Sequence, residues 1–186
     1  AGIKAIVIYP MNALATDQAK RFAEAIHAED MLRGKVTAGL FIGDEGDEAL
    51  AMTEKWLITH KGQMREHPPD ILLTNYKMLD YLLLRPQDQT LWRFNEKGAL
   101  RYLVLDELHT YDGAQGADVA CLIRRLKERL EIAKGELCVV GTSATLDDRE
   151  PPRDALRQGM EIVRDYVGAD GKPVTTVRQG DELTVR

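Results

Sequence analysis

Short runs of consecutive apolar residues recur along the chain, and stretches with apolar residues three or four positions apart lie between them. The first pattern is typical of strands buried on both faces, and the second of amphipathic helices. The runs predict strands at 5–9, 36–42, 71–74, 102–105 and 137–141, with a possible last strand at 174–177. The spacing predicts helices at 14–28, 49–63, 78–84, 117–130 and 153–167. We therefore expect an α/β fold, with a parallel sheet covered by helices on both faces.

Composition narrows the class of protein. The 186 residues are 44% hydrophobic and 30% charged, which is ordinary for a globular domain. No apolar run approaches the roughly 20 residues that cross a bilayer, so we expect no membrane partner. The two cysteines, Cys121 and Cys138, lack a CxxC spacing. They are interpreted as reduced core thiols, which favours a cytoplasmic location.

The net charge is −5, so the whole chain has no general attraction for nucleic acid. A nucleic-acid partner would have to be held by a local surface or by backbone amides. This counts mildly against a simple DNA-binding module.

The predicted strand at 102–105 ends in ionisable residues. Asp106 and Glu107 follow it directly, and His109 comes two residues later. Paired carboxylates at a strand end suit a hydrated Mg²⁺, and one of them could orient or deprotonate an attacking water. His109 could report the state of that site through a hydrogen bond. The alternative is that the acidic pair only caps the next helix.

Polar residues also end three other predicted strands. Ser143 and Thr145 lie in GTSAT, where their hydroxyls could reach a carboxylate on the neighbouring strand or form an ordinary turn. Asn12 is a plausible N-cap after the first strand, and LLTNYKML opens a helix after the third. Helix starts of this kind suit a nucleic-acid phosphate, although each is equally consistent with a capped helix that has no ligand.

Together these segments resemble one helicase family. LVLDELH (103–109) is similar to motif II, the Walker B box, and GTSAT (141–145) to motif III. YPMNALATDQ (9–18) is similar to motif Ia, and LLTNYKML (72–79) to motif Ib. The order is that of the first motor domain of superfamily 2 helicases of the DEAD/DEAH-box type. The block DELHTYDGAQGADVACLIRRLK resembles the Lhr-like bacterial branch.

The resemblance implies a RecA-like fold of the P-loop NTPase type, with ATP and Mg²⁺ as cofactors. Asp106 would hold Mg²⁺ largely through water, Glu107 would act as general base, and His109 would join the catalytic residues. Two residues of motif III would couple the nucleotide state to strand movement: Ser143 and Thr145. Six residues would lie on or near the nucleic-acid track: Pro10, Asn12, Gln18, Thr74, Asn75 and Tyr76.

The chain departs from the DEAD-box pattern in motifs Ia and Ib. Met11-Asn12-Ala13 stands where Thr-Arg-Glu is usual, and Asn75-Tyr76-Lys77 where Pro-Gly-Arg is usual. These departures favour DNA over RNA. The sequence also contains no Gly-rich phosphate loop GxxxxGK[ST] and no second motor domain. We expect a first motor domain at 1–167 that is incomplete at its N-terminus, and a segment at 168–186 that leads toward a second RecA-like domain.

Two other functions are compatible with the residues. One is a Mg²⁺-dependent nuclease that uses Asp106, Glu107, His109 and Asp112, although it leaves the motif Ia, Ib and III segments unexplained. The other is a non-catalytic nucleic-acid-binding scaffold that retains the fold. Elsewhere, Trp56 and Trp92 are expected in the core.

The 186-residue chain by itself is predicted to show weak or undetectable ATP turnover, because it contains no phosphate loop. A nucleic-acid-stimulated phosphate-release assay on the purified chain checks this. Robust turnover would show that the nucleotide site has been misread.

Overall fold

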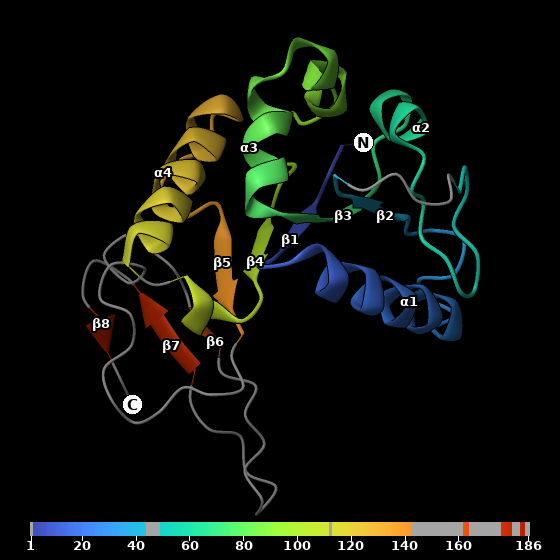
Figure 1. Ribbon diagram of the computed structural model, residues 1–186, viewed down its shortest axis with the longest axis horizontal. Helices are drawn as coiled ribbons and strands as arrows, with labels where there is room; N and C mark the ends of the chain where they lie inside the picture. Colours follow the sequence, from blue (N-terminus) through green and yellow to red (C-terminus); the bar gives the residue numbers. More distant parts are fainter. Residues whose placement is uncertain are drawn as a thin grey trace, which may run out of the picture.

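The computed structural model describes residues 2–43, 49–111 and 113–142, together with the backbone of 162–163, 176–179 and 183–184 (Figure 1). Its main sheet has five parallel strands in the order β2-β3-β1-β4-β5. Their bounds are β1 (Ala5–Tyr9), β2 (Ala38–Phe41), β3 (Ile71–Asn75), β4 (Tyr102–Leu105) and β5 (Cys138–Gly141). The expected parallel α/β sheet is confirmed.

Helices cover both faces of this sheet. The described residues include four α-helices: α1 (Asn12–Ala28), α2 (Lys61–Glu66), α3 (Tyr76–Leu84) and α4 (Gly113–Arg129). They also include two short 3₁₀ helices: η1 (Pro86–Trp92) and η2 (Leu108–Thr110). In Figure 1, α3 and α4 lie side by side on one face and α1 lies on the other. Three short strands form a separate antiparallel sheet: β6 (Ile162–Val163), β7 (Thr176–Gln179) and β8 (Leu183–Thr184).

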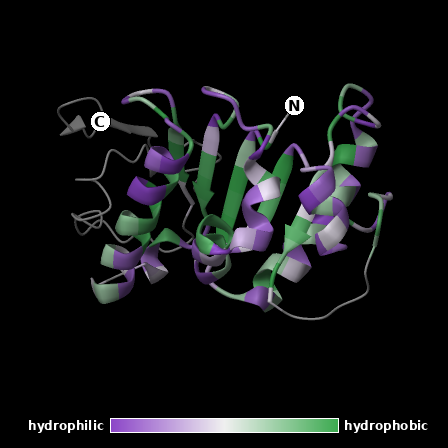
Figure 2. Ribbon diagram, turned by 90° about the horizontal axis from the view of Figure 1, so that it is seen from above, coloured by the Kyte–Doolittle hydropathy of each residue, from purple (hydrophilic) through white to green (hydrophobic). Residues whose placement is uncertain are grey.

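The central strand β1 is buried on both faces. Ile6 and Ile8 belong to the apolar cluster that includes residues of α3 and α4. Val7 and Tyr9 alternate with them and belong to the cluster that includes the apolar residues of α1. Since successive side chains of a strand point to opposite faces, a doubly covered strand must be apolar throughout. Figure 2 shows the resulting hydrophobic strands between more polar helices.

The prediction of a helix at 49–63 is wrong for most of that range. Instead, Ile58 pairs with the outer edge of β2: its N–H donates to Ala38 O at 3.1 Å, and its carbonyl accepts from Leu40 N at 2.8 Å. Helix α2 begins only at Lys61. Pairing with an open sheet edge therefore overrides the local helical spacing. Trp56, expected in the core, is 64% exposed on this segment.

Other expectations differ in part. Trp92 is buried as expected, and its indole N–H donates to Leu82 O at 2.8 Å. Cys121 is exposed and Cys138 is half-buried, so neither is a core thiol. The helix predicted at 153–167 lies largely outside the described residues, but Ile162–Val163 within it is a strand. Within the described part of the chain, no helix is both long and apolar enough to cross a membrane.

Asp70 ties three strands together at the amino end of the sheet. Its carboxylate accepts from Lys4 Nζ at 2.6 Å, from Thr37 N at 2.8 Å and from Thr37 Oγ1 at 3.0 Å. Burial by itself would raise the pKa of Asp70, but the hydrogen bonds from Lys4 and Thr37 outweigh burial and lower it. The ionised carboxylate is thus the form that the fold stabilises.

Asp70→Asn is predicted to lower the free energy of unfolding by about 1 kcal/mol at pH 7, because a partly exposed charged acceptor is lost. A lowered folded-state pKa gives stability that is present above the unfolded pKa and lost as pH falls through the folded value. The difference from the parent protein should therefore shrink below about pH 4. Urea unfolding at several pH values checks this, with the exposed Asp30→Asn as control. A pH-independent difference would contradict the assignment.

Candidate functional site

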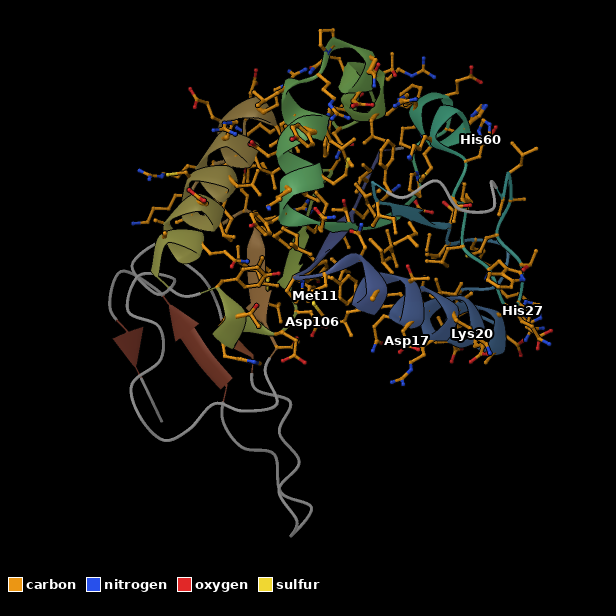
Figure 3. The ribbon with its side chains drawn as sticks, viewed as in Figure 1. Met11, Asp17, Lys20, His27, His60 and Asp106 are labelled. Atoms are coloured by element: carbon orange, nitrogen blue, oxygen red, sulfur yellow. The ribbon has the colours of Figure 1, made fainter. Side chains whose placement is uncertain are left out.

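Polar residues gather at the carboxyl edge of the main sheet. Because its five strands are parallel, their carboxyl ends lie at one edge, where ligands of such folds commonly bind. Figure 3 labels Met11 at the start of α1 and Asp106 just past the end of β4. The labelled His27 and His60 lie away from this edge.

An acidic turn, residues 106–109, follows β4. It is anchored by the N–H of Asp106, which donates to Ile8 O on β1 at 2.9 Å. Glu107 has φ 52° and ψ 50°, the left-handed conformation that is costly for a residue with a side chain. The N–H and the hydroxyl of Thr110 both donate to Glu107 O, each at 2.8 Å. Glu107 is therefore held in a strained conformation by η2.

Each carboxylate of the acidic turn has a partner. His109 Nδ1 lies 3.3 Å from Glu107 Oε2, so the structure brings these two predicted residues together. The hydroxyl of Thr142 donates to Asp106 Oδ1. The sequence suggested that a hydroxyl of GTSAT could reach a neighbouring carboxylate, but named Ser143 and Thr145 rather than Thr142. The signal that could have identified Thr142 is its position, one residue past the end of β5.

The oxygen donors of this turn fit a hydrated Mg²⁺. Asp106 and Glu107 are both half-buried and offer carboxylate oxygens, the ligands that Mg²⁺ prefers. No group of three or more His, Cys, Asp or Glu side chains suited to a metal occurs among the described residues. Two carboxylates suffice for an ion that keeps several waters and binds substrate phosphates.

Leu108 packs the turn into the core. Its side chain is fully buried, and its N–H donates to Thr142 O at 2.8 Å. A Cβ atom at Gly141 would lie 2.6 Å from Leu108 Cδ2, so this position of β5 has no room for a side chain. The glycine that the sequence places before the hydroxyls of GTSAT thus lets the acidic turn approach β5.

A cleft of about 500 Å³ lies at the ends of β1 and β3. Ten residues line it: Pro10, Met11, Asn12, Gly43, Asn75, Tyr76, Lys77, Met78, Tyr81 and Gln115. Four of the six residues expected on the nucleic-acid track are among them, from motifs Ia and Ib. The structure therefore brings these two distant segments to one cavity.

Asn75 organises the cleft. Its side-chain oxygen accepts from Met78 N at 2.7 Å and so caps α3, while its Nδ2 donates to Asn12 Oδ1 at 2.5 Å. Asn12, expected to cap α1, is instead the first residue of that helix, and Met11 occupies the N-cap position without a side-chain bond. The β1 and β3 ends are thus joined by an amide pair.

Two expected track residues lie elsewhere. Thr74 is fully buried, and its hydroxyl donates to Phe41 O at 2.6 Å, so it joins β3 to β2 and is not available to a ligand. Gln18 lies further along α1 and does not line the cleft. Ser143 and Thr145 lie outside the described residues, as does Asp112 of the nuclease alternative.

Two buried tyrosines flank the acidic turn. Burial, and then the negative charge of Asp106, raise the pKa of Tyr9 and of Tyr111 well above the ordinary tyrosine value. Tyr76 and Glu107 add smaller effects at Tyr111. Both hydroxyls therefore stay protonated near neutral pH.

The sequence profile of DEAD/DEAH box helicases matches residues 1–153. This chain belongs to the DEAD/DEAH box helicase family. The resemblance that motifs Ia, Ib, II and III suggested is confirmed, and with it the RecA-like interpretation of the sheet.

Individual relatives agree with the family. The Druantia protein DruE of Escherichia coli (strain UMEA 4076-1) is 35% identical over 151 residues, which are 77% of this chain and 8% of DruE. The structure of the DUF1998 helicase MrfA bound to DNA and AMPPNP superposes with a TM-score of 0.62 at 27% identity, over 92% of this chain and 21% of MrfA.

The helicase Lhr of Mycobacterium smegmatis, solved with ssDNA and AMP-PNP, gives a TM-score of 0.61 at 23% identity, over 88% of this chain and 20% of Lhr. At that identity the likeness shows the shared fold. The chain spans about a fifth of the two solved helicases and less of DruE.

Gly141→Ala is predicted to lower the free energy of unfolding by about 1–3 kcal/mol, because the added methyl group overlaps buried Leu108. Chemical denaturation checks this. Gly43→Ala is the matched control, since a Cβ there meets only Met78 Cε at an ordinary 3.7 Å. Equal stability of the two variants would contradict the close contact.

Proposed function

We propose that the chain is part of the first motor domain of an ATP-dependent helicase or translocase that acts on DNA. One observation carries the proposal: β1 serves both candidate sites. Its Ile8 carbonyl anchors the acidic turn, and the residues directly after its end, Pro10 and Asn12, line the cleft. In a motor, ATP hydrolysis must change the contacts with nucleic acid. The two sites therefore need a structural element in common, and β1 is such an element.

The acidic turn is suited to the part of an ATP site that binds the metal ion and the attacking water. Bound Mg-ATP would supply the transferable phosphoryl group and the cation that offsets its charge. Asp106 would hold Mg²⁺ largely through water, oriented by the Thr142 hydroxyl. Glu107 would position the attacking water and take its proton, with His109 beside its carboxylate. The coupling roles of Ser143 and Thr145 belong to this proposal.

The cleft is suited to a nucleic-acid strand although the net charge of the chain is negative. Its polar lining consists of the amides of Asn12, Asn75 and Gln115, the rings and hydroxyls of Tyr76 and Tyr81, and the amine of Lys77. The neutral groups and the start of α3 can contact phosphates without a basic surface. Thr74 would act indirectly, by holding β3 to β2. Gln18 remains a weaker candidate, further along α1.

The preference for DNA over RNA rests on two features. Motifs Ia and Ib depart from the DEAD-box pattern, and Met11 presents a 61% exposed apolar side chain to the cleft. MrfA, a relative by fold and sequence, was solved bound to DNA. An apolar contact offers no partner to a ribose 2′-hydroxyl.

The proposal extends to the surroundings of the chain. A second RecA-like domain of the same protein would complete the ATP site, with residues 1–167 forming the first domain and 168–186 leading away from it. A cytoplasmic location without a membrane partner is part of the same proposal.

A Mg²⁺-dependent nuclease remains the second enzymatic candidate. It would use the carboxylates of the acidic turn but leave the cleft without an explanation. DNA cleavage with Mg²⁺ and without ATP would favour it. A non-catalytic scaffold would show neither cleavage nor turnover.

In the full-length protein, numbered as here, Glu107→Gln is predicted to lower ATP turnover at least about 100-fold, because the water loses its base. ATP affinity should change little, since the amide keeps the shape of the side chain. Phosphate release with and without single-stranded DNA, beside nucleotide binding, checks this. Single-stranded RNA in a parallel arm tests the preference for DNA.

Glu24→Gln on the exposed surface of α1 is the matched control and should leave turnover unchanged. DNA-stimulated turnover that Glu107→Gln abolishes would support the motor. Unchanged turnover in Glu107→Gln would remove Glu107 from this role, and no turnover with any nucleic acid would favour the scaffold or the nuclease.

A further inference from the structure

Tyr111 joins segments that the proposed motor must couple. It is 3% exposed and follows η2 directly, and its N–H donates to Leu108 O at 3.1 Å to close that turn. Its hydroxyl donates to Ile8 O on β1 at 3.4 Å. The same Ile8 carbonyl accepts from Asp106 N, so Tyr111 and the acidic turn share one anchor.

The ring of Tyr111 does not line the cleft, but it contacts a residue that does. It meets Tyr76 edge-to-face, with ring centroids 6.3 Å apart and planes at 86°. Aromatic pairs in this arrangement attract each other more than their buried area predicts. Tyr76 is half-buried and lines the cleft, so a ligand there would touch one ring of the pair directly.

Helix α4 fixes Tyr111 from the other side. A Cβ atom at Gly116 would lie 2.7 Å from Tyr111 O, so α4 approaches the backbone there as closely as a glycine permits. With its carbonyl in close contact and its ring against Tyr76, Tyr111 has little room to move alone. Displacing the ring would therefore require the backbone of η2 to shift as well.

We propose that Tyr111 is a positioning residue that couples nucleic acid in the cleft to the conformation of Glu107. The inference rests on the motor function proposed above. Glu107 is the N-cap of η2 and has a left-handed backbone. A residue in this conformation carries backbone strain, which the surrounding contacts must hold in place. A strand that presses on Tyr76 would change those contacts through Tyr111.

The test uses the full-length protein and single-stranded DNA. In Tyr111→Leu, the ratio of DNA-stimulated to basal ATP turnover at saturating DNA should fall about 10-fold, a typical size for coupling between sites. Basal turnover and the Kd for DNA should each stay within about 3-fold, since Tyr111 does not line the cleft and the variant keeps the backbone hydrogen bond from residue 111 to Leu108. Tyr111→Phe keeps the ring and should retain the stimulation. Tyr102→Leu, an exposed tyrosine at the start of β4, is the control.

Three outcomes would overturn the proposal. Stimulation that survives in Tyr111→Leu would show that the ring carries no coupling. A proportional loss of basal turnover and stimulation would show a merely structural role. Equal loss in Tyr111→Phe would show that the hydroxyl bond to Ile8, and not the ring contact, matters.

Because Tyr111 is buried, its replacement can prevent folding, and a second variant is therefore needed. If Tyr111→Leu fails to fold, Tyr76→Leu removes the other ring of the pair and is assayed at saturating DNA. Lost stimulation there supports the proposal, and retained stimulation overturns it. If the unmutated protein shows no DNA stimulation, the motor function itself fails. If the unmutated protein, Tyr111→Leu and Tyr76→Leu all show normal stimulation, the coupling role of Tyr111 is rejected and the motor function stands.

Discussion

Burial of β1 between β3 and β4 is the constraint on which the rest of the structure depends. The strand pairs in parallel with both neighbours, and its apolar residues contribute to the clusters on both faces of the sheet. Parallel pairing brings the carboxyl ends of the three strands to one edge. The acidic turn after β4 and the amide pair of Asn12 and Asn75 therefore lie at the same edge, although they are far apart in the sequence.

Close packing then shapes the acidic turn. Leu108 fills a fully buried position against Gly141, and the chain must reverse between the end of β4 and η2. Glu107 adopts a left-handed conformation in that reversal, which a residue with a side chain rarely accepts without support. Hydrogen bonds from Thr110 give that support. The strain is thus located at the residue to which the proposed chemistry assigns the attacking water.

The cleft shows how a chain of net charge −5 could hold a polyanion. Its polar side chains include the amides of Asn12, Asn75 and Gln115, and Asn75 is held by bonds to Met78 and Asn12. Groups fixed before a ligand arrives lose little freedom when it binds. In the proposed function, amides held in fixed orientations would take the place of a basic surface, so the negative net charge would not prevent nucleic-acid binding.

The sequence by itself determined the buried strands and the residues at their ends. Continuous apolar runs identify doubly covered strands. The four motif-like segments indicate the family, the acidic turn and four residues that line the cleft: Pro10, Asn12, Asn75 and Tyr76. These features are local: periodicity reveals the strands, and the resemblance of short segments to known motifs implies the rest. Only the tertiary structure decided that residues near Ile58 extend along β2, that Thr74 points inward, and that Thr142 meets Asp106. The reason is physical: an open sheet edge, the register between strands and contacts such as Tyr76–Tyr111 arise between segments distant in sequence, and no local pattern encodes them.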